Sequence, residues 1–257
     1  IVIRFAGDSG DGMQLTGDQF TTASAMMGDD VATLPDYPSE IRAPAGTVYG
    51  VSGFQLRFGG NEVFTPGDQF DVLVAMNPAA LKTNLPNLKP NGIIIVNDDA
   101  FSARNLEKAG YPTNPLDDAE LSQKYRLHRV AVSKLTQAAL TGSPLSPKQV
   151  DLCKNFFALG LTFWMFNRSA EPTVNWLKKK FKNKPELLDA NLKVLQAGNS
   201  YGETAEIFTN SYIIRRREET KPGTYRYITG NTAAGLGLIA GAHQAGLKLF
   251  LGSYPIT

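Results

Sequence analysis

Two short apolar runs decide the fold: Asp71-Val72-Leu73-Val74-Ala75-Met76 and Ile93-Ile94-Ile95-Val96. Runs of this kind are typical of strands in the middle of a parallel sheet that is covered on both faces. Each run ends in polar residues, Asn77 after the first and Asn97-Asp98-Asp99 after the second. The sequence therefore contains the centre of a parallel sheet with polar tips at its strand ends.

Strands and helices alternate outward from this centre. Ile1 to Ala6 predicts a first strand, and a glycine-rich turn, Gly7-Asp8-Ser9-Gly10-Asp11-Gly12, separates it from a helix with one buried stripe. Further strands are expected at 31–34, at 54–58 (half-exposed, because Gln55 and Arg57 alternate with apolar residues) and at 126–132, and helices at 146–166, 173–182 and 185–196. This order predicts an α/β fold, a Rossmann-like, doubly wound, mostly parallel sheet.

Composition narrows the class of protein. The 257 residues carry 26 Lys and Arg against 24 Asp and Glu, a net charge of +2 that gives no reason to expect a nucleic-acid partner. The longest apolar stretch, 156–166, is too short to span a membrane. The single cysteine, Cys153, excludes a disulfide framework and an iron–sulfur cluster held by this chain alone. The chain begins mid-strand at Ile1 and stops after an apolar strand, so a fragment of a longer protein is expected.

The glycine-rich turn allows two interpretations. A dinucleotide site needs G-x-G-x-x-G, but Ser9 stands at the middle glycine, and Asp8 and Asp11 would oppose a pyrophosphate. The other interpretation is a tight turn that lets the helix pack closely on the strand through Gly12 and Gly17. The second is favoured.

Other reactive residue types have structural interpretations that compete with functional ones. Cys153 lies on a predicted core helix and is expected to be buried and unreactive. His128 and His243 have no companion at the spacing of a metal site or a catalytic triad, so no metal site is expected. Asp98 and Asp99 could hold a metal, or they could cap a helix or be solvated, and the second interpretation is favoured.

A cluster of lysines surrounds Trp176 and Phe181. It could contact a nucleotide phosphate such as that of coenzyme A, or it could be a solvated helix face; its members are Lys178, Lys179, Lys180, Lys182 and Lys184.

The composition changes after Gly198. Residues 199–222 are polar and predict a linker, and 223–257 begin a second unit. That unit contains a small-residue helix from Gly230 to near Gly246, a strand at 247–251 and the loop Ser253-Tyr254-Pro255-Ile256-Thr257.

These motifs together resemble the 2-oxoacid:ferredoxin oxidoreductases. Residues 1–198 look like the γ domain of that family, with Ser9 in place of a glycine in the opening turn and with Pro38-Ser39-Glu40-Ile41-Arg42 as a second shared motif. Residues 223–257, which carry Gly230-Asn231 and the Tyr-Pro-Ile-Thr loop, look like the start of its pyrimidine-binding thiamine diphosphate domain. A γ domain fused ahead of a pyrimidine-binding domain makes the chain similar to the α subunit of the family members that act on 2-oxoglutarate.

The resemblance implies an activity and a set of partners. Such enzymes decarboxylate a 2-oxoacid on thiamine diphosphate, pass electrons through iron–sulfur clusters to ferredoxin and release an acyl-coenzyme A. It implies a catalytic Thr257, a pocket floor of Tyr254, Pro255 and Ile256, and coenzyme A near Lys178, Lys179 and Lys180. The Mg²⁺, the cofactor pyrophosphate and the [4Fe-4S] clusters belong mainly to a β subunit, so the chain is expected to need that partner, the continuation of the α subunit and ferredoxin, in the cytoplasm.

Two other functions stay open at this point. A nucleotide-dependent dehydrogenase would use the turn at Gly7–Gly12, although its carboxylates argue against this. A non-catalytic assembly module would use the glycine-faced helix only for subunit contacts.

Overall fold

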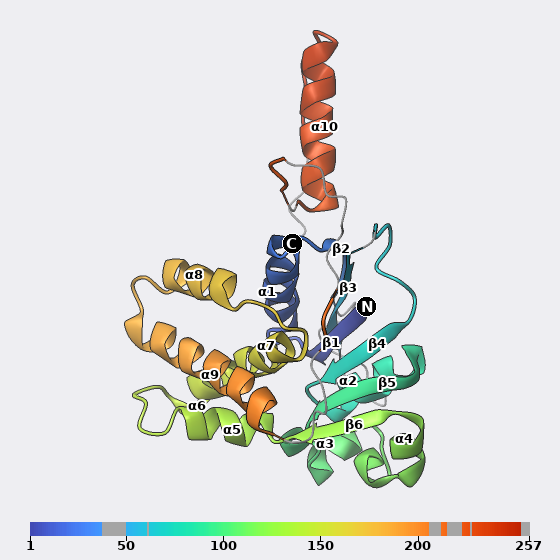
Figure 1. Ribbon diagram of the computed structural model, residues 1–257, viewed down its shortest axis with the longest axis vertical. Helices are drawn as coiled ribbons and strands as arrows, with labels where there is room; N and C mark the ends of the chain where they lie inside the picture. Colours follow the sequence, from blue (N-terminus) through green and yellow to red (C-terminus); the bar gives the residue numbers. More distant parts are fainter. Residues whose placement is uncertain (38–49, 61, 206–211, 215–222, 227, 253–257) are drawn as a thin grey trace. The chain divides into compact units, whose positions relative to one another are not determined.

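The computed structural model describes residues 1–37, 50–60, 62–205, 212–214, 223–226 and 228–252. The chain divides into two compact units, Ile1–Glu219 and Thr220–Thr257. The first unit contains the sheet and most of the helices, and a single helix dominates the described part of the second (Figure 1).

A six-stranded sheet in the order β2-β3-β1-β4-β5-β6 organises the first unit. Strands β1, β4, β5 and β6 are parallel to one another, while β3 is antiparallel to both β1 and β2. The mostly parallel sheet is therefore confirmed. The strands are β1 Val2–Asp8, β2 Asp30–Asp36, β3 Val51–Gly59, β4 Phe70–Ala75, β5 Leu88–Asn97 and β6 Arg126–Val130.

Helices cover both faces of this sheet, as Figure 1 shows. They are α1 Met13–Met26, α2 Pro78–Asn84, α3 Ala103–Lys108, α4 Ala119–Lys124, α5 Val132–Ala139, α6 Pro147–Leu152, α7 Lys154–Met165, α8 Glu171–Lys180 and α9 Pro185–Thr204, with short 3₁₀ turns at Leu85–Asn87, Asp98–Ala100 and Pro115–Asp117. The second unit contributes α10, Gly230–Gln244.

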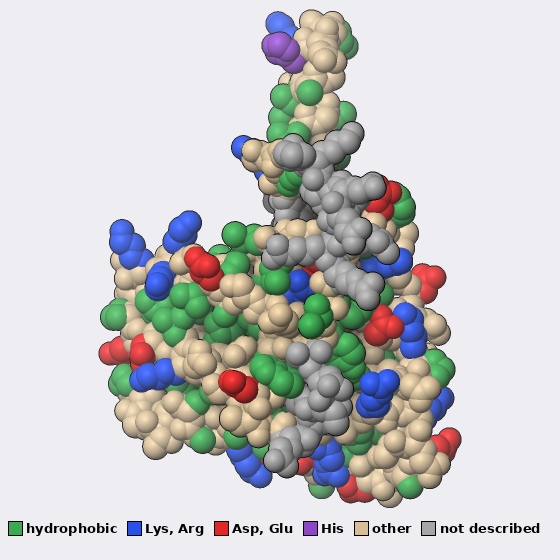
Figure 2. Space-filling model, viewed as in Figure 1, with side chains coloured by type: hydrophobic (Ala, Val, Ile, Leu, Met, Phe, Trp, Pro, Cys, Tyr) green, Lys and Arg blue, Asp and Glu red, His purple; other side chains and the backbone are tan. Residues whose placement is uncertain are grey.

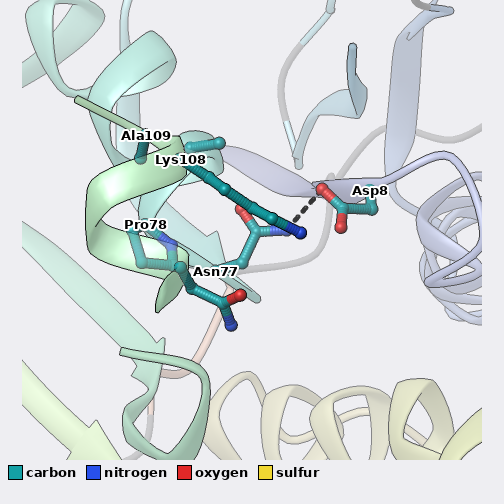
Figure 3. Close-up of a pocket in the computed structure, with 7 residues that line it drawn as sticks. Asp8, Asn77, Pro78, Lys108 and Ala109 are labelled. Atoms are coloured by element: carbon teal, nitrogen blue, oxygen red, sulfur yellow. Dashed lines mark hydrogen bonds between the residues drawn. The ribbon is translucent and has the colours of Figure 1, made fainter. Parts of the chain in front are cut away.

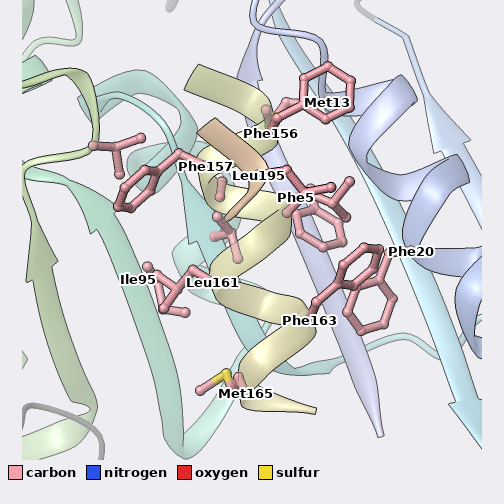
Figure 4. Close-up of a cluster of buried hydrophobic side chains, with 14 of the residues drawn as sticks. Phe5, Met13, Phe20, Ile95, Phe156, Phe157, Leu161, Phe163, Met165 and Leu195 are labelled. Atoms are coloured by element: carbon pink, nitrogen blue, oxygen red, sulfur yellow. The ribbon is translucent and has the colours of Figure 1, made fainter. Parts of the chain in front are cut away.

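Alternation along β1 sends its side chains into two separate cores. Phe5 packs with Phe20 of α1 and with the apolar side of α7, which contributes Phe163 (Figure 4). Val2 and Ala6 point to the opposite face, where α2 and the Leu121 side chain of α4 cover them. Successive side chains of a strand point to opposite faces, so one strand serves both layers and the sheet is doubly wound.

The expectation that residues 54–58 form a half-exposed strand is wrong. Gln55 is only 4% exposed, and its amide donates to the carbonyl oxygens of Pro66 and Gly67. Strand β3 lies between β2 and β1 with both faces covered, so its polar side chain is buried and satisfied by a loop instead of by water.

The single helix expected at 146–166 is two helices, α6 and α7, which meet at Cys153. There the backbone hydrogen bonds shift to the three-residue spacing: Cys153 N donates to Val150 O and Phe156 N donates to Cys153 O. This shift ends α6, and α7 then passes through the core with ten of its twelve residues buried.

The expected start of the linker at residue 199 is also wrong, because α9 continues to Thr204. Gly198 and Gly202 lie inside this helix and face α7, so the glycines after Leu195 mark close helix packing and not a chain break.

In the second unit, the predicted small-residue helix is confirmed as α10, and none of its described residues is buried. The strand expected at 247–251 is not formed: in the described part of the chain these residues pair with no strand and have no regular secondary structure. A strand needs a neighbour for its backbone groups, and an apolar run alone does not supply one.

Candidate functional site

The connections of the sheet diverge at the carboxyl ends of β1 and β4. Strand β1 leads into α1 on one face and on to β2, whereas β4 leads into α2 on the other face and on to β5. In open α/β sheets, ligands bind in the crevice at such a switch point. The side chains that follow these two strands are therefore the first candidates for a site.

Asp8 at the end of β1 and Asn77 after β4 bridge this crevice. Asn77 Nδ2 donates to Asp8 Oδ1 at 2.8 Å, and Asn77 Oδ1 accepts the Ala80 N–H at 2.8 Å as the N-cap of α2. Both ends of the amide are used, so its orientation is fixed. Burial raises the pKa of Asp8, the neighbouring Asp11 carboxylate raises it further, and the hydrogen bond from Asn77 partly opposes both.

Asp11 closes the glycine-rich turn from inside. One of its oxygens accepts the Asp8 N–H at 2.9 Å, and the other lies 3.0 Å from Lys154 Nζ at the start of α7. The turn therefore holds an ion pair of its own where a dinucleotide site would hold a pyrophosphate. This arrangement disfavours a nucleotide-dependent dehydrogenase.

The two glycines that the sequence assigns to close packing do have that role. Gly12 has φ +74°, and a side chain there would lie 2.5 Å from the Asn155 amide nitrogen. A Cβ at Gly17 would lie 2.1 Å from the ring of Phe54 on β3. Close packing of the helix on a strand is confirmed at Gly17, whereas Gly12 packs against α7.

A cavity of about 190 Å³ opens beside Asp8 and Asn77. Figure 3 shows the Lys108 side chain of α3 extending toward the Asp8 carboxylate across this cavity. Its lining residues are Asp8, Asn77, Pro78, Ala79, Asn105, Lys108 and Ala109. The sequence indicates the polar residue after β4, Asn77. It does not indicate Lys108, because no local sequence signal shows that α3 folds back over β1.

The lysine cluster lies at the end of α8 and beyond it, and Lys178, Lys179 and Lys180 are all exposed. Figure 2 shows lysine side chains gathered over this part of the molecule. Lys180 Nζ lies 4.8 Å from the centre of the Trp176 ring, whose other atoms pack on the core. Among the described residues, no carboxylate forms an ion pair with any lysine of the cluster. The cluster is thus a positively charged surface whose lysines have no carboxylate partner among the described residues. Such a surface attracts phosphate.

Cys153 is buried, and its Sγ donates to Gln149 O at 3.3 Å. Burial raises the pKa of the thiol to about 11, so the expectation of an inert structural cysteine agrees with its surroundings. His128 lies on β6, where burial lowers the pKa of its imidazole.

The two acids after β5 have structural partners. Asp99 accepts the Lys134 N–H at 2.9 Å in the first turn of α5, and Asp98 lies 2.8 Å from Arg129 Nε. Asp99 therefore caps the first turn of α5, whereas Asp98 forms an ion pair. No three potential His, Cys, Asp or Glu ligands are gathered within the described residues.

Tyr254, Pro255, Ile256 and Thr257 lie outside the described residues, as does Pro38–Arg42. His243 lies on α10.

Of the helices that the structure describes, none combines the length and apolar character needed to cross a membrane.

The fold defines an α/β domain of the doubly wound class, with a cavity at its switch point. The chain belongs to the pyruvate ferredoxin/flavodoxin oxidoreductase family, whose model matches residues 2–201. The resemblance seen in the sequence is confirmed.

One curated protein and two solved structures are similar to this chain. The chain is 52% identical over all 257 residues to the 2-oxoglutarate oxidoreductase subunit KorA of Mycobacterium tuberculosis, and it spans 39% of that protein's length. It is similar to the 2-oxoglutarate:ferredoxin oxidoreductase of Magnetococcus marinus, solved with 2-oxoglutarate, coenzyme A and succinyl-CoA bound, with a TM-score of 0.70 and 25% identity over 94% of this chain and 37% of that one. A keto/oxoacid ferredoxin oxidoreductase γ subunit of Geobacter sulfurreducens shares the fold, with a TM-score of 0.53 and 20% identity over 79% of this chain and 99% of its own.

Proposed function

We propose that this chain is part of the α subunit of a thiamine-diphosphate-dependent 2-oxoacid:ferredoxin oxidoreductase that prefers 2-oxoglutarate. The supporting observation is the 52% identity that extends over the whole chain, both units included, to a 2-oxoglutarate oxidoreductase subunit. The reaction converts a 2-oxoacid and coenzyme A into CO₂ and an acyl-coenzyme A, and the two electrons released reduce ferredoxin.

The cofactors of this reaction come largely from another polypeptide. A [4Fe-4S] cluster needs about four thiolates, and the single thiol here is buried, hydrogen-bonded and of raised pKa. We assign the clusters, Mg²⁺ and most thiamine diphosphate contacts to a β subunit, within a cytoplasmic complex that also contains the continuation of the α subunit. When bound, thiamine diphosphate supplies the electron sink for decarboxylation.

In this proposal the γ domain ends with α9 at Thr204, a linker follows up to residue 222, and 223–257 begin the pyrimidine-binding domain. Thr257 donates a hydrogen bond to the substrate oxygen on which negative charge develops, and Tyr254, Pro255 and Ile256 form the pocket floor. Residues 233–242 of α10 are all apolar or glycine, which supports a second domain, because a helix that is apolar on every side is stable only when enclosed.

The γ domain contributes to coenzyme A binding through Lys178, Lys179 and Lys180. The three lysines are exposed and carry no ion pair among the described residues, and the Lys180 ammonium lies 4.8 Å from the centre of the Trp176 ring. Phosphates prefer such a site, and the indole offers a stacking surface beside it.

The test is to produce the complete α subunit with its β partner under anoxic conditions. We expect a brown complex that reduces a viologen dye with a 2-oxoacid, and a Thr257→Ala variant whose kcat/KM is lower by about tenfold to a hundredfold while the protein and its iron content are unchanged. No dye reduction with any 2-oxoacid would overturn the proposal. An unchanged kcat/KM for Thr257→Ala would remove that residue from the site.

A further inference from the structure

The proposed function assigns no role to the cavity at the carboxyl ends of β1 and β4. Its volume of about 190 Å³ equals roughly six water molecules at about 30 Å³ each, enough for a small organic molecule. It lies at the switch point of the sheet, where open α/β sheets bind ligands.

Two opposite charges face this cavity, and each has capacity for a further partner. No carboxylate of the described residues forms an ion pair with Lys108 Nζ. Asp8 Oδ1 accepts from Asn77, but Asp8 Oδ2 accepts from no donor in the described part of the chain. Lys108 is nevertheless close enough to Asp8 to act on its pKa, so both groups border one space.

These charges select among ligand classes. A phosphate or other dianion would be attracted by Lys108 but repelled by Asp8. A simple cation would be attracted by Asp8 but repelled by Lys108. A molecule with an anionic end and a cationic end satisfies both groups at once. A ligand ammonium beside Asp8 would also favour the charged carboxylate and so oppose the desolvation that raises the pKa of this group.

We propose that this cavity binds a small zwitterionic amino acid, with its carboxylate on Lys108 and its ammonium on Asp8 Oδ2. Asn77 is a positioning residue, because its amide holds Asp8 on one side and caps α2 on the other.

The test is calorimetric titration of the complete complex with glycine, L-alanine, L-serine, L-aspartate and L-glutamate. N-acetyl derivatives, which lack the ammonium, and the amino acid amides, which lack the carboxylate, serve as ligand controls. We expect at least one of the free amino acids to bind, and each control derivative to bind at least tenfold more weakly.

Variants separate this cavity from the 2-oxoacid site, which could itself accept an amino acid. Lys108→Gln and Asp8→Asn should each weaken binding at least tenfold. Arg104→Gln removes the same charge from the same helix but lies outside the cavity lining, and it should leave binding unchanged. Circular dichroism checks that each variant is folded.

Absence of binding by all five amino acids would overturn this inference, and so would binding that survives both Lys108→Gln and Asp8→Asn. Dye reduction measured on the same preparation distinguishes this failure from a failure of the proposed function, since an active complex that binds no amino acid contradicts the inference alone.

Discussion

The ammonium of Lys154 lies 3.0 Å from the carboxylate of Asp11 and so joins the start of α7 to the turn between β1 and α1. The two side chains are only 15% and 13% exposed. Lys154 has a second partner, Asp151 at 3.1 Å, whereas Asp11 has no second cation among the described ion pairs. The interior of the glycine-rich turn is therefore neutralised by the protein itself.

This asymmetry predicts unequal effects of the two substitutions. Lys154→Met leaves Asp11 buried and unpaired and should lower the free energy of unfolding by about 3 kcal/mol. Asp11→Asn keeps an oxygen for the Asp8 N–H and leaves Lys154 paired with Asp151, so about 1 kcal/mol is expected. Urea unfolding measures both values. Equal losses for the two variants would contradict the pairing described here.

The contact between α7 and α9 depends on glycine at Gly160 and Gly198. A Cβ at Gly160 would lie 2.1 Å from Leu195 O, and one at Gly198 would lie 2.0 Å from Phe157 O. Alanine would gain about 1 kcal/mol of helix propensity at either position, but a clash with backbone cannot be relieved by a rotamer change.

We therefore expect Gly160→Ala to lower the free energy of unfolding by about 2 kcal/mol or more. Gly59→Ala is the control, because no atom lies within 4 Å of its added Cβ and its effect should stay within about 0.5 kcal/mol. A Gly160→Ala protein as stable as the control would show that the two helices are farther apart than described.

Cys153 should be unreactive in the native protein. Its pKa of about 11 leaves about one thiol in a thousand ionised at pH 8, against about one in ten at the ordinary value of 9.0, and the group is buried as well. Mass spectrometry of the peptide containing Cys153 after iodoacetamide treatment should find little label at pH 8 and complete label in urea. Rapid native labelling would place this thiol at the surface.

The lysine cluster gives a kinetic prediction that rests on the proposed function. Replacing Lys178, Lys179 and Lys180 by Gln together should raise the KM for coenzyme A roughly threefold to tenfold with little change in kcat, because exposed ion pairs are individually weak. The same replacement at Lys124, Lys148 and Lys193 is the control, since these lysines are exposed elsewhere. Equal effects of the two triple variants would indicate only a change in net charge.

The sequence predicts the sheet because β4 and β5 contain the apolar runs 72–75 and 93–96. It predicts close packing at Gly12 and Gly17 because the carboxylates of the turn argue against a dinucleotide site there. It does not predict that Gln55 is buried, since the burial depends on β3 being an interior strand and on two carbonyl groups of the loop between β3 and β4. The break at Cys153 is missed for a related reason: the apolar pattern continues across it, and only the backbone hydrogen bonds change.

The sequence indicates only some of the residues that line the candidate cavity. Asp8 and Asn77 each follow an apolar strand, and parallel strands bring their carboxyl ends to one edge. Lys108 comes from α3, about thirty residues beyond Asn77 in the sequence, and tertiary packing alone brings it over the crevice.

The most direct test of the central claim is the initial rate of viologen reduction by the complex of complete α and β subunits, measured with 2-oxoglutarate and with pyruvate, each with and without coenzyme A. We predict reduction that requires both 2-oxoglutarate and coenzyme A, with a kcat/KM for 2-oxoglutarate at least tenfold above that for pyruvate. Equal or greater kcat/KM for pyruvate would contradict the assigned substrate, and no reduction under any of the four conditions would contradict the assigned function.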